Sequence, residues 1–125
     1  MDTSHLLHND LTGKILEAAF EVSKELGAGF LETVYERSMQ IALMHKGINC
    51  SLQVPLKVKF RNVIVGDYFA DMLIEGKVIV ELKTVTNLTG QHKAQVINYL
   101  KATGVDVGLL INFGNPRLEY HRLYK

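Results

Sequence analysis

The sequence predicts a single α/β (α+β) domain, with elements in the order helix, helix, three or four strands, helix, strand, strand. Three observations lead to this prediction. The chain has 125 residues, the length of one ordinary domain. Apolar residues recur every three or four positions in the first third and then alternate with polar ones. No repeat or linker interrupts the chain, so we expect one domain over residues 1–125, with a loose polar segment at residues 1–10.

Three helices are predicted, and a glycine follows each of them, as is common at helix ends. Residues 11–26 precede Gly27, residues 31–46 precede Gly47, and residues 87–103 precede Gly104. The second helix has a candidate inner stripe at helical spacing, made of Leu31, Val34, Tyr35, Ser38, Ile41 and Ala42.

The strands follow from period-two alternation and apolar runs. Pro55 interrupts the first strand, which indicates an edge strand or a bulge. Arg61 and Asn62 form a plausible turn after it. Residues 68–74 and 78–83 form a hairpin across the loop at residues 75–77. The predicted strands cover residues 51–60, 63–65, 68–74, 78–83, 107–112 and 118–124.

Composition limits the classes of function. The net charge is only +1, so any binding of nucleic acid must rest on local patches. Cys50 is the single cysteine, which excludes an internal disulfide and fits a reducing compartment. We find no signal peptide and no apolar run long enough for a membrane helix. These features predict a soluble, cytoplasmic protein without a membrane partner.

Ionisable residues in two apolar strands are the most informative feature. Asp71, Glu81 and Lys83 lie in runs that otherwise have the composition of a core, where charge is costly unless paired or metal-bound. Glu81 and Lys83 share one face because side chains alternate along a strand. A three-residue loop at 75–77 places Asp71 opposite Glu81, whereas a two-residue loop would put it on the other face. The three-residue loop also sets Leu73 opposite Ile79, so we predict that register.

Two facing carboxylates repel each other unless a cation lies between them, and oxygen ligands favour Mg²⁺ or Mn²⁺ over zinc. The carbonyl of Leu82 could add a third oxygen. Lys83 would then hold the attacking water or meet charge that builds on a phosphate. The alternative is a structural ion pair between Lys83 and Asp71 or Glu81.

The helix at residues 87–103 adds polar groups to the same region. His92, Gln95 and Tyr99 share a face that overlaps its apolar stripe, and buried polar groups need partners. Gln95 and Tyr99 could orient a phosphate or a metal-bound water. For His92 a helix-start position near solvent is the simpler interpretation. Glu32 opens the second helix, where it either complements the helix dipole or adds a metal or water ligand.

These residues resemble a known family. Residues 29–35, Gly-Phe-Leu-Glu-Thr-Val-Tyr, fit the motif G-x-x-E-x-x-Y of the bacterial and archaeal family named after it, within the PD-(D/E)XK nuclease superfamily. The resemblance runs from about Leu11 to the C-terminus. It includes Val54-Pro55-Leu56, Ala70-Asp71, Val78 to Lys83, Ala94-Gln95, Tyr99-Leu100-Lys101 and Gly108 to Gly114.

The resemblance implies a restriction-endonuclease-like core, with a central mixed sheet flanked by helices in the order α-α-β-β-β-α-β-β. It also implies that Glu32, Asp71, Glu81 and Lys83 form the active site. Gln95 and Tyr99 resemble the Q-x-x-x-Y element of RecB-like nucleases. The proline of the superfamily name is replaced by Ala70, a departure shared by many members.

Two functions compete on this basis. One is a Mg²⁺- or Mn²⁺-dependent nuclease that cuts DNA or RNA, with DNA favoured. The other is a non-catalytic nucleic-acid-binding or assembly protein that keeps the fold. Basic residues available for phosphates are scattered, so a homodimer or a partner protein would add contacts. The sequence lacks a P-loop, a G-x-G-x-x-G turn, a C-x-x-C pair and a G-x-S-x-G turn, which argues against nucleotide, redox and serine-hydrolase chemistry.

Overall fold

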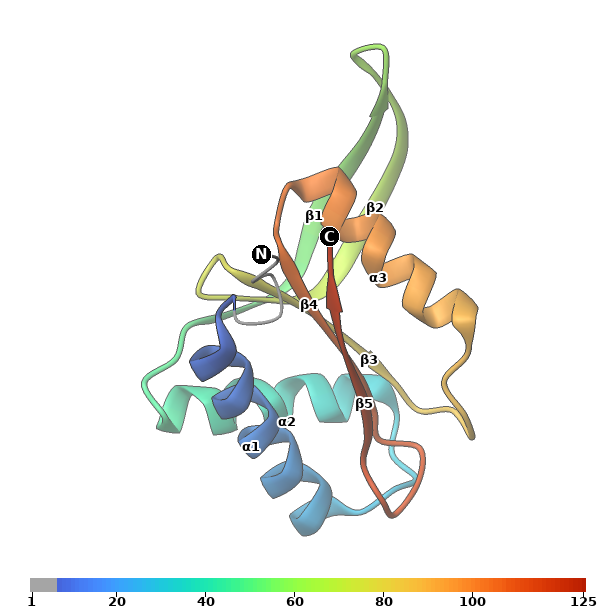
Figure 1. The fold of residues 1–125 in the computed structure, drawn as a ribbon. Helices are drawn as coiled ribbons and strands as arrows, with labels where there is room; N and C mark the ends of the chain where they lie inside the picture. Colours follow the sequence, from blue (N-terminus) through green and yellow to red (C-terminus); the bar gives the residue numbers. More distant parts are fainter. Residues whose placement is uncertain (1–6) are drawn as a thin grey trace.

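The computed structural model describes residues 7–125 and contains three helices and one five-stranded sheet (Figure 1). The predicted order α-α-β-β-β-α-β-β and the α+β fold class are confirmed. The expected loose segment at residues 1–10 lies mainly outside the described residues, and Asn9 and Asp10 already belong to the first helix. The elements are α1 (Asn9–Leu26), α2 (Glu32–His45), β1 (Cys50–Phe60), β2 (Val63–Ile74), β3 (Val78–Lys83), α3 (Gly90–Thr103), β4 (Val107–Asn112) and β5 (Glu119–Tyr124).

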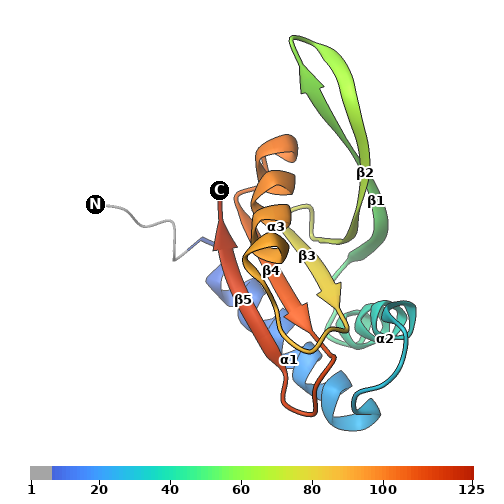
Figure 2. The ribbon, with the colours of Figure 1, turned by 90° about the vertical axis from the view of Figure 1, so that its right-hand side faces the viewer.

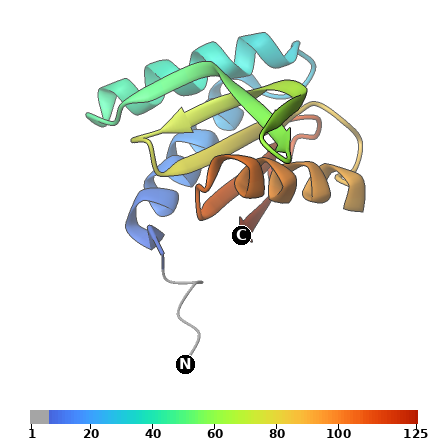
Figure 3. The same ribbon diagram turned by 90° about the horizontal axis from the view of Figure 1, so that it is seen from above.

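The sheet is mixed and follows the chain order β1-β2-β3-β4-β5. Strands β3 and β4 are parallel, and every other neighbouring pair is antiparallel. The parallel pair requires a crossover, which α3 provides. Helices α1 and α2 cover one face of the sheet and α3 covers the other (Figures 2 and 3).

Two clusters of buried side chains form the core, one on each face of the sheet. The larger cluster joins α1 and α2 to the sheet and includes Ile15, Met39 and Leu82. The smaller cluster lies under α3 and includes Ile79 and Leu100. Within residues 7–125, no helix is long and apolar enough to cross a membrane.

Helix α2 faces the sheet with a different stripe from the predicted one. The sequence pattern places Leu31, Val34 and Ile41 on the inner side, but they are 77%, 36% and 46% exposed. Tyr35 of the predicted stripe is buried and Ala42 packs against the core, but the other buried positions are Glu36, Met39 and Leu43. The ring of Tyr35 stacks on Phe113 at 4.5 Å between centroids, and this contact directs that side of the helix toward the sheet.

The strands predicted at residues 63–65 and 68–74 are one continuous strand, β2. With β1 it forms a long hairpin whose distal half projects from the body (Figures 1 and 2). Arg61 and Asn62 form its two-residue tip with φ of 51° and 66°, which matches the left-handed turn favoured in such hairpins. We call residues 57–68 the hairpin arm.

Pro55 lies in an edge strand, as predicted, and β1 also bends two residues earlier. Gln53 has φ of 50°, an unusual value for a residue other than glycine. Leu52 packs in the α1/α2 cluster and Leu56 in the α3 cluster, although residues four apart in a regular strand share a face. Opposite Asp71, the irregularity at Gln53 therefore changes which face of the sheet the alternate side chains of β1 occupy.

The chain leaving β3 is held against the end of β4. Asn112 is fully buried; its Oδ1 accepts from the Val85 N–H at 3.0 Å, and its Nδ2 donates to the Val85 carbonyl at 2.8 Å. A Cβ on Gly114 would lie 2.1 Å from the Val85 oxygen. This close approach fixes the segment that directly follows Lys83.

We therefore predict that Gly114→Ala lowers the free energy of unfolding by about 1–3 kcal/mol, the usual cost of overpacking. Gly13→Ala is the matched control. Gly13 is exposed in α1, and a Cβ added to it would meet no atom within 4 Å, so alanine should stabilise that helix by about 0.5–1 kcal/mol. Urea unfolding measures both changes. Equal stability of Gly114→Ala and the wild type would contradict the close packing against Val85.

Candidate active site

Asp71 and Glu81 meet where β2 separates from β3. The ladder between these strands includes Leu73 opposite Ile79, which confirms the predicted register, and it ends at Met72 and Val80. Beyond that pair, hydrogen bonds from backbone N–H groups to the two carboxylates replace the backbone ladder. The Asp71 N–H donates to Glu81 Oε1 at 2.9 Å, and the Leu82 N–H donates to Asp71 Oδ2 at 2.8 Å.

Glu81 occupies a poorly hydrated position, and Asp71 beside it is half-buried. Glu81 is only 3% exposed. Burial, and secondly the charge of Asp71, raise the pKa of Glu81 from 4.5 to about 8. At neutral pH, Glu81 therefore keeps a proton unless a cation replaces it.

Lys83 lies two residues beyond Glu81 on β3 and is partly exposed. Its charge opposes the pKa increases of both Glu81 and Glu32, so it acts electrostatically on carboxylates from two elements. In the described part of the chain, it forms no ion pair within 4.0 Å. The alternative of a structural ion pair between Lys83 and Asp71 or Glu81 is thus not found.

Glu32 reaches the same region from α2, and Tyr35 holds the segment that presents it. The buried hydroxyl of Tyr35 donates to the Gly27 carbonyl at 2.6 Å and accepts from the Phe30 N–H at 3.4 Å. Burial, with the charge of Asp71 contributing, raises the pKa of Glu32. The glutamate of the motif at residues 29–35 thus lies within the electrostatic influence of Asp71 and Lys83, while its tyrosine fixes the loop ahead of the helix.

Two residues of the site were missed from the sequence. Glu36 is 7% exposed and lies one helical turn after Glu32. Gln53 Nε2 donates to Glu36 Oε1 at 2.7 Å and to Asp71 Oδ1 at 3.4 Å. Burial raises the pKa of Glu36, although the bond from Gln53 opposes this. The i, i+4 spacing from Glu32 was the signal in the sequence for Glu36; Gln53 had none.

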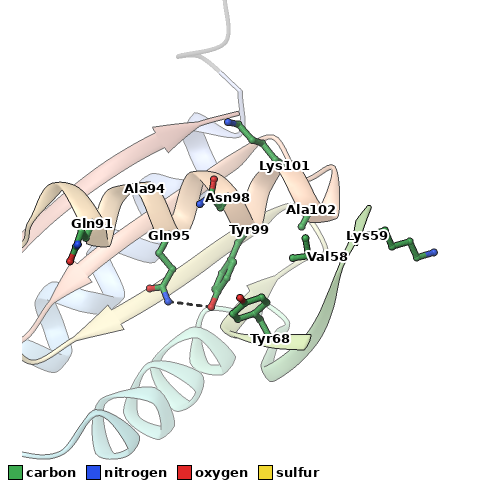
Figure 4. A pocket seen from close by; sticks show the side chains of 10 residues that line it. All are labelled: Val58, Lys59, Tyr68, Gln91, Ala94, Gln95, Asn98, Tyr99, Lys101 and Ala102. Atoms are coloured by element: carbon green, nitrogen blue, oxygen red, sulfur yellow. Dashed lines mark hydrogen bonds between the residues drawn. The ribbon is translucent and has the colours of Figure 1, made fainter. Parts of the chain in front are cut away.

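Helix α3 contributes Gln95 and Tyr99 from the other side of the sheet edge. Gln95 Nε2 donates to the Tyr99 hydroxyl at 3.2 Å (Figure 4). Burial, and then the charge of Glu81, raise the pKa of Tyr99, so its phenol lies within the field of the carboxylate pair. His92 instead belongs to a capping box with Thr89: its Nδ1 accepts from the Thr89 N–H at 3.0 Å. The simpler interpretation of His92, a residue of the helix start, agrees with this position.

The oxygen atoms gathered at this point are of the type that binds a hard divalent cation. Asp71 and Glu81 offer carboxylate oxygens, the backbone of Leu82 lies beside them, and the buried negative charge lacks a compensating ion pair among residues 7–125. Across the same residues, no group of three or more His, Cys, Asp or Glu side chains is arranged to hold a metal. The pair alone would supply only part of a coordination shell, which Glu32 or water would have to complete.

The raised pKa of Glu81 predicts a pH-dependent stability in the absence of divalent metal. The folded protein binds the proton of Glu81 more strongly than the unfolded chain does. The contribution of that proton to the free energy of unfolding is therefore fully present below pH 4.5 and is lost as the pH rises to about 8. Glu81→Gln should remove that loss. Relative to the wild type, its free energy of unfolding should gain at least about 1 kcal/mol between pH 5 and pH 8, since one pKa unit corresponds to about 1.4 kcal/mol.

Urea unfolding in EDTA at both pH values tests this prediction. Glu25→Gln, an exposed change on α1, is the control and should follow the wild type. A constant difference between Glu81→Gln and the wild type across this pH range would show that Glu81 is ionised in the folded protein.

Comparison with known proteins agrees with the fold. No curated protein sequence matches the chain. A solved structure described as "Crystal structure of SSO0001" is similar in fold, with a TM-score of 0.57 and 15% sequence identity. The similarity covers 96% of this chain and 60% of that protein, so the chain spans under two thirds of its length. The family model of the PD-(D/E)XK nuclease superfamily matches residues 9–123, and the chain therefore belongs to this superfamily.

Proposed function

We propose that this protein is a Mg²⁺- or Mn²⁺-dependent nuclease that hydrolyses phosphodiester bonds, in DNA rather than RNA. The observation that carries the proposal is the pairing of the half-buried Asp71 with the buried Glu81, with Lys83 two residues further along β3. Within the superfamily, we assign the chain to the family of the G-x-x-E-x-x-Y motif. The bonds of Tyr35 support this assignment because they give the motif a structural task.

Asp71, Glu81 and the Leu82 carbonyl would hold the metal, and Glu32 would complete the shell directly or through water. When bound, the metal lowers the pKa of a water molecule and offsets charge on the phosphate. Lys83 would hold the attacking water or donate to the phosphate oxygen on which charge develops.

The remaining polar residues would position these groups and the substrate. Gln53 holds Asp71 Oδ1 and Glu36 Oε1, so it limits the rotation of the Asp71 carboxylate. On the opposite side, the Tyr99 hydroxyl and the Gln95 amide would orient a substrate phosphate or a metal-bound water. This division assigns a task to each buried polar group around the pair.

The competing function is a non-catalytic nucleic-acid-binding or assembly protein with the same fold. The observation in its favour is the incomplete donor set, since no three ligating side chains are arranged for a metal in residues 7–125. The raised pKa of Glu81 favours the nuclease. A protein that only binds nucleic acid would gain nothing from a second carboxylate buried beside Asp71.

Lys83→Ala should lower the rate of cleavage at least about a hundredfold, the usual cost of removing a group that stabilises transition-state charge. Lys77→Ala, which removes an exposed lysine from the β2–β3 loop, is the control and should retain full activity. Labelled single-stranded, duplex and branched DNA and RNA are incubated with the protein and Mn²⁺ at low salt. If the wild-type protein cleaves none of these substrates, the catalytic proposal fails.

Metal binding separates the two candidate functions without relying on turnover. Asp71→Ala should lose Mn²⁺ binding in a calorimetric titration, because it removes one of two facing carboxylates, whereas Lys83→Ala should retain binding. Asp106→Ala, on the far end of the sheet near Lys125, is the matched control. Equal Mn²⁺ affinity for Asp71→Ala and the wild type would place the metal elsewhere and favour the non-catalytic protein.

A further inference from the structure

A cleft lies between the hairpin arm and α3, beside the candidate active site (Figure 4). Its volume is about 640 Å³, within the range of pockets that bind organic ligands. One wall comes from the arm and carries Tyr68 and Lys59; the other is the exposed side of α3. Neither the proposed nuclease chemistry nor the core clusters use Tyr68, Lys59, Gln91 or Asn98, so these wall residues need a separate explanation.

Tyr68 presents an aromatic ring that is held in place yet accessible. The ring lies over Gly66 on the same strand, where a Cβ would be 2.8 Å from Tyr68 Cε2. Its other neighbour is the Tyr99 ring, at 5.9 Å between centroids and a tilt of 46°. Tyr68 nevertheless remains 48% exposed. A pre-oriented ring with open surface is the kind of platform on which a nucleobase stacks.

The rest of the lining matches the other parts of a nucleotide. Side-chain amides of Gln91, Gln95 and Asn98 line the α3 wall, and amides can bond to the edges of unpaired bases. Lys59 and Lys101 stand at the rim, one on each wall, with side chains that extend outward (Figure 4). Aromatic and amide groups are thus inside the cleft and positive charge is at its edge.

The cleft shares two residues with the candidate active site. Tyr99 and Gln95 line it, and Tyr99 also lies within the electrostatic reach of Glu81 and Asp71. A strand lying along α3 would therefore lead toward the carboxylate pair.

The charge of the cleft distinguishes an unpaired strand from a duplex. A protein that binds a duplex through its backbone can neutralise about 6–10 phosphates with basic side chains, whereas this cleft offers only two lysines for that purpose. A duplex also keeps its bases stacked and paired, so the ring of Tyr68 would find no free base face in it. An unpaired strand offers base faces to this ring and Watson–Crick edges to the amides of α3.

We propose that the cleft between the hairpin arm and α3 binds an unpaired nucleic acid strand, with a base stacked on Tyr68 and phosphates met by Lys59 and Lys101. The proposal rests on the proposed nuclease function in assigning nucleic acid as the ligand. It goes beyond that function in naming single-stranded segments as the form that reaches the site.

Binding is measured by fluorescence anisotropy in EDTA, so that cleavage does not contribute. The probes are a labelled oligothymidylate, an abasic strand of the same length and a blunt duplex, each about 12 nucleotides long, within the usual site size of ~4–16. Tyr68→Ala should weaken binding of oligothymidylate roughly tenfold, and Tyr68→Phe should restore it. The abasic strand should bind weakly to the wild type and show no further loss in Tyr68→Ala.

Two matched controls separate stacking from charge. Tyr120→Ala removes a tyrosine of similar exposure, 42%, that contacts Phe20 near the opposite edge of the sheet; it should bind like the wild type. Lys59→Gln and Lys101→Gln should each flatten the slope of log affinity against log salt by about 0.7, the value for one single-strand phosphate contact.

The proposal is overturned if oligothymidylate does not bind, if Tyr68→Ala binds it as tightly as the wild type, or if the duplex or the abasic strand binds equally well. Cleavage with Mn²⁺ is assayed separately. Tyr68-dependent binding without cleavage supports strand binding in the cleft and refutes the proposed nuclease activity. Cleavage that depends neither on Tyr68 nor on strand pairing refutes strand binding in the cleft and supports the nuclease activity.

Discussion

The structure depends on a constraint at one point of the sheet, where β2 leaves β3 and two carboxylates replace the strand ladder. Asp71 and Glu81 bond to backbone N–H groups there, and neither is paired with a lysine in the described part of the chain. Such an arrangement costs free energy when both groups are ionised, because the charge of Glu81 is then buried beside that of Asp71. A folded protein retains it at a functional site, where a proton or a cation balances the charge.

The surrounding elements hold this point from several directions. Tyr35 fixes the entry to α2 and so the position of Glu32, while Asn112 and Gly114 fix the exit of β3 directly after Lys83. Gln53 has a positive φ in β1 opposite Asp71, and its side-chain amide donates to Asp71 Oδ1.

Much of this could be predicted from the sequence because it follows from local periodicity. The spacing of Leu73, Ile79 and the loop at 75–77 set the register that places Asp71 beside Glu81. The inner stripe of α2 could not be predicted in the same way. Leu31 and Ile41 are exposed because tertiary contacts, the stacking of Tyr35 on Phe113 and the bond from Gln53 to Glu36, determine which side faces the sheet. Gln53 itself has a positive φ that its residue type does not indicate, so its role emerges only from the fold.

The central claim is that the carboxylate pair binds a hard divalent cation. The most direct measurement is anomalous diffraction from a crystal soaked in Mn²⁺, since the signal locates the ion independently of turnover. If the pair binds the ion, one anomalous peak is expected within bonding distance of carboxylate oxygens from both Asp71 and Glu81. Density that shows these carboxylates unchanged, with the ion bound elsewhere or not at all, would contradict it.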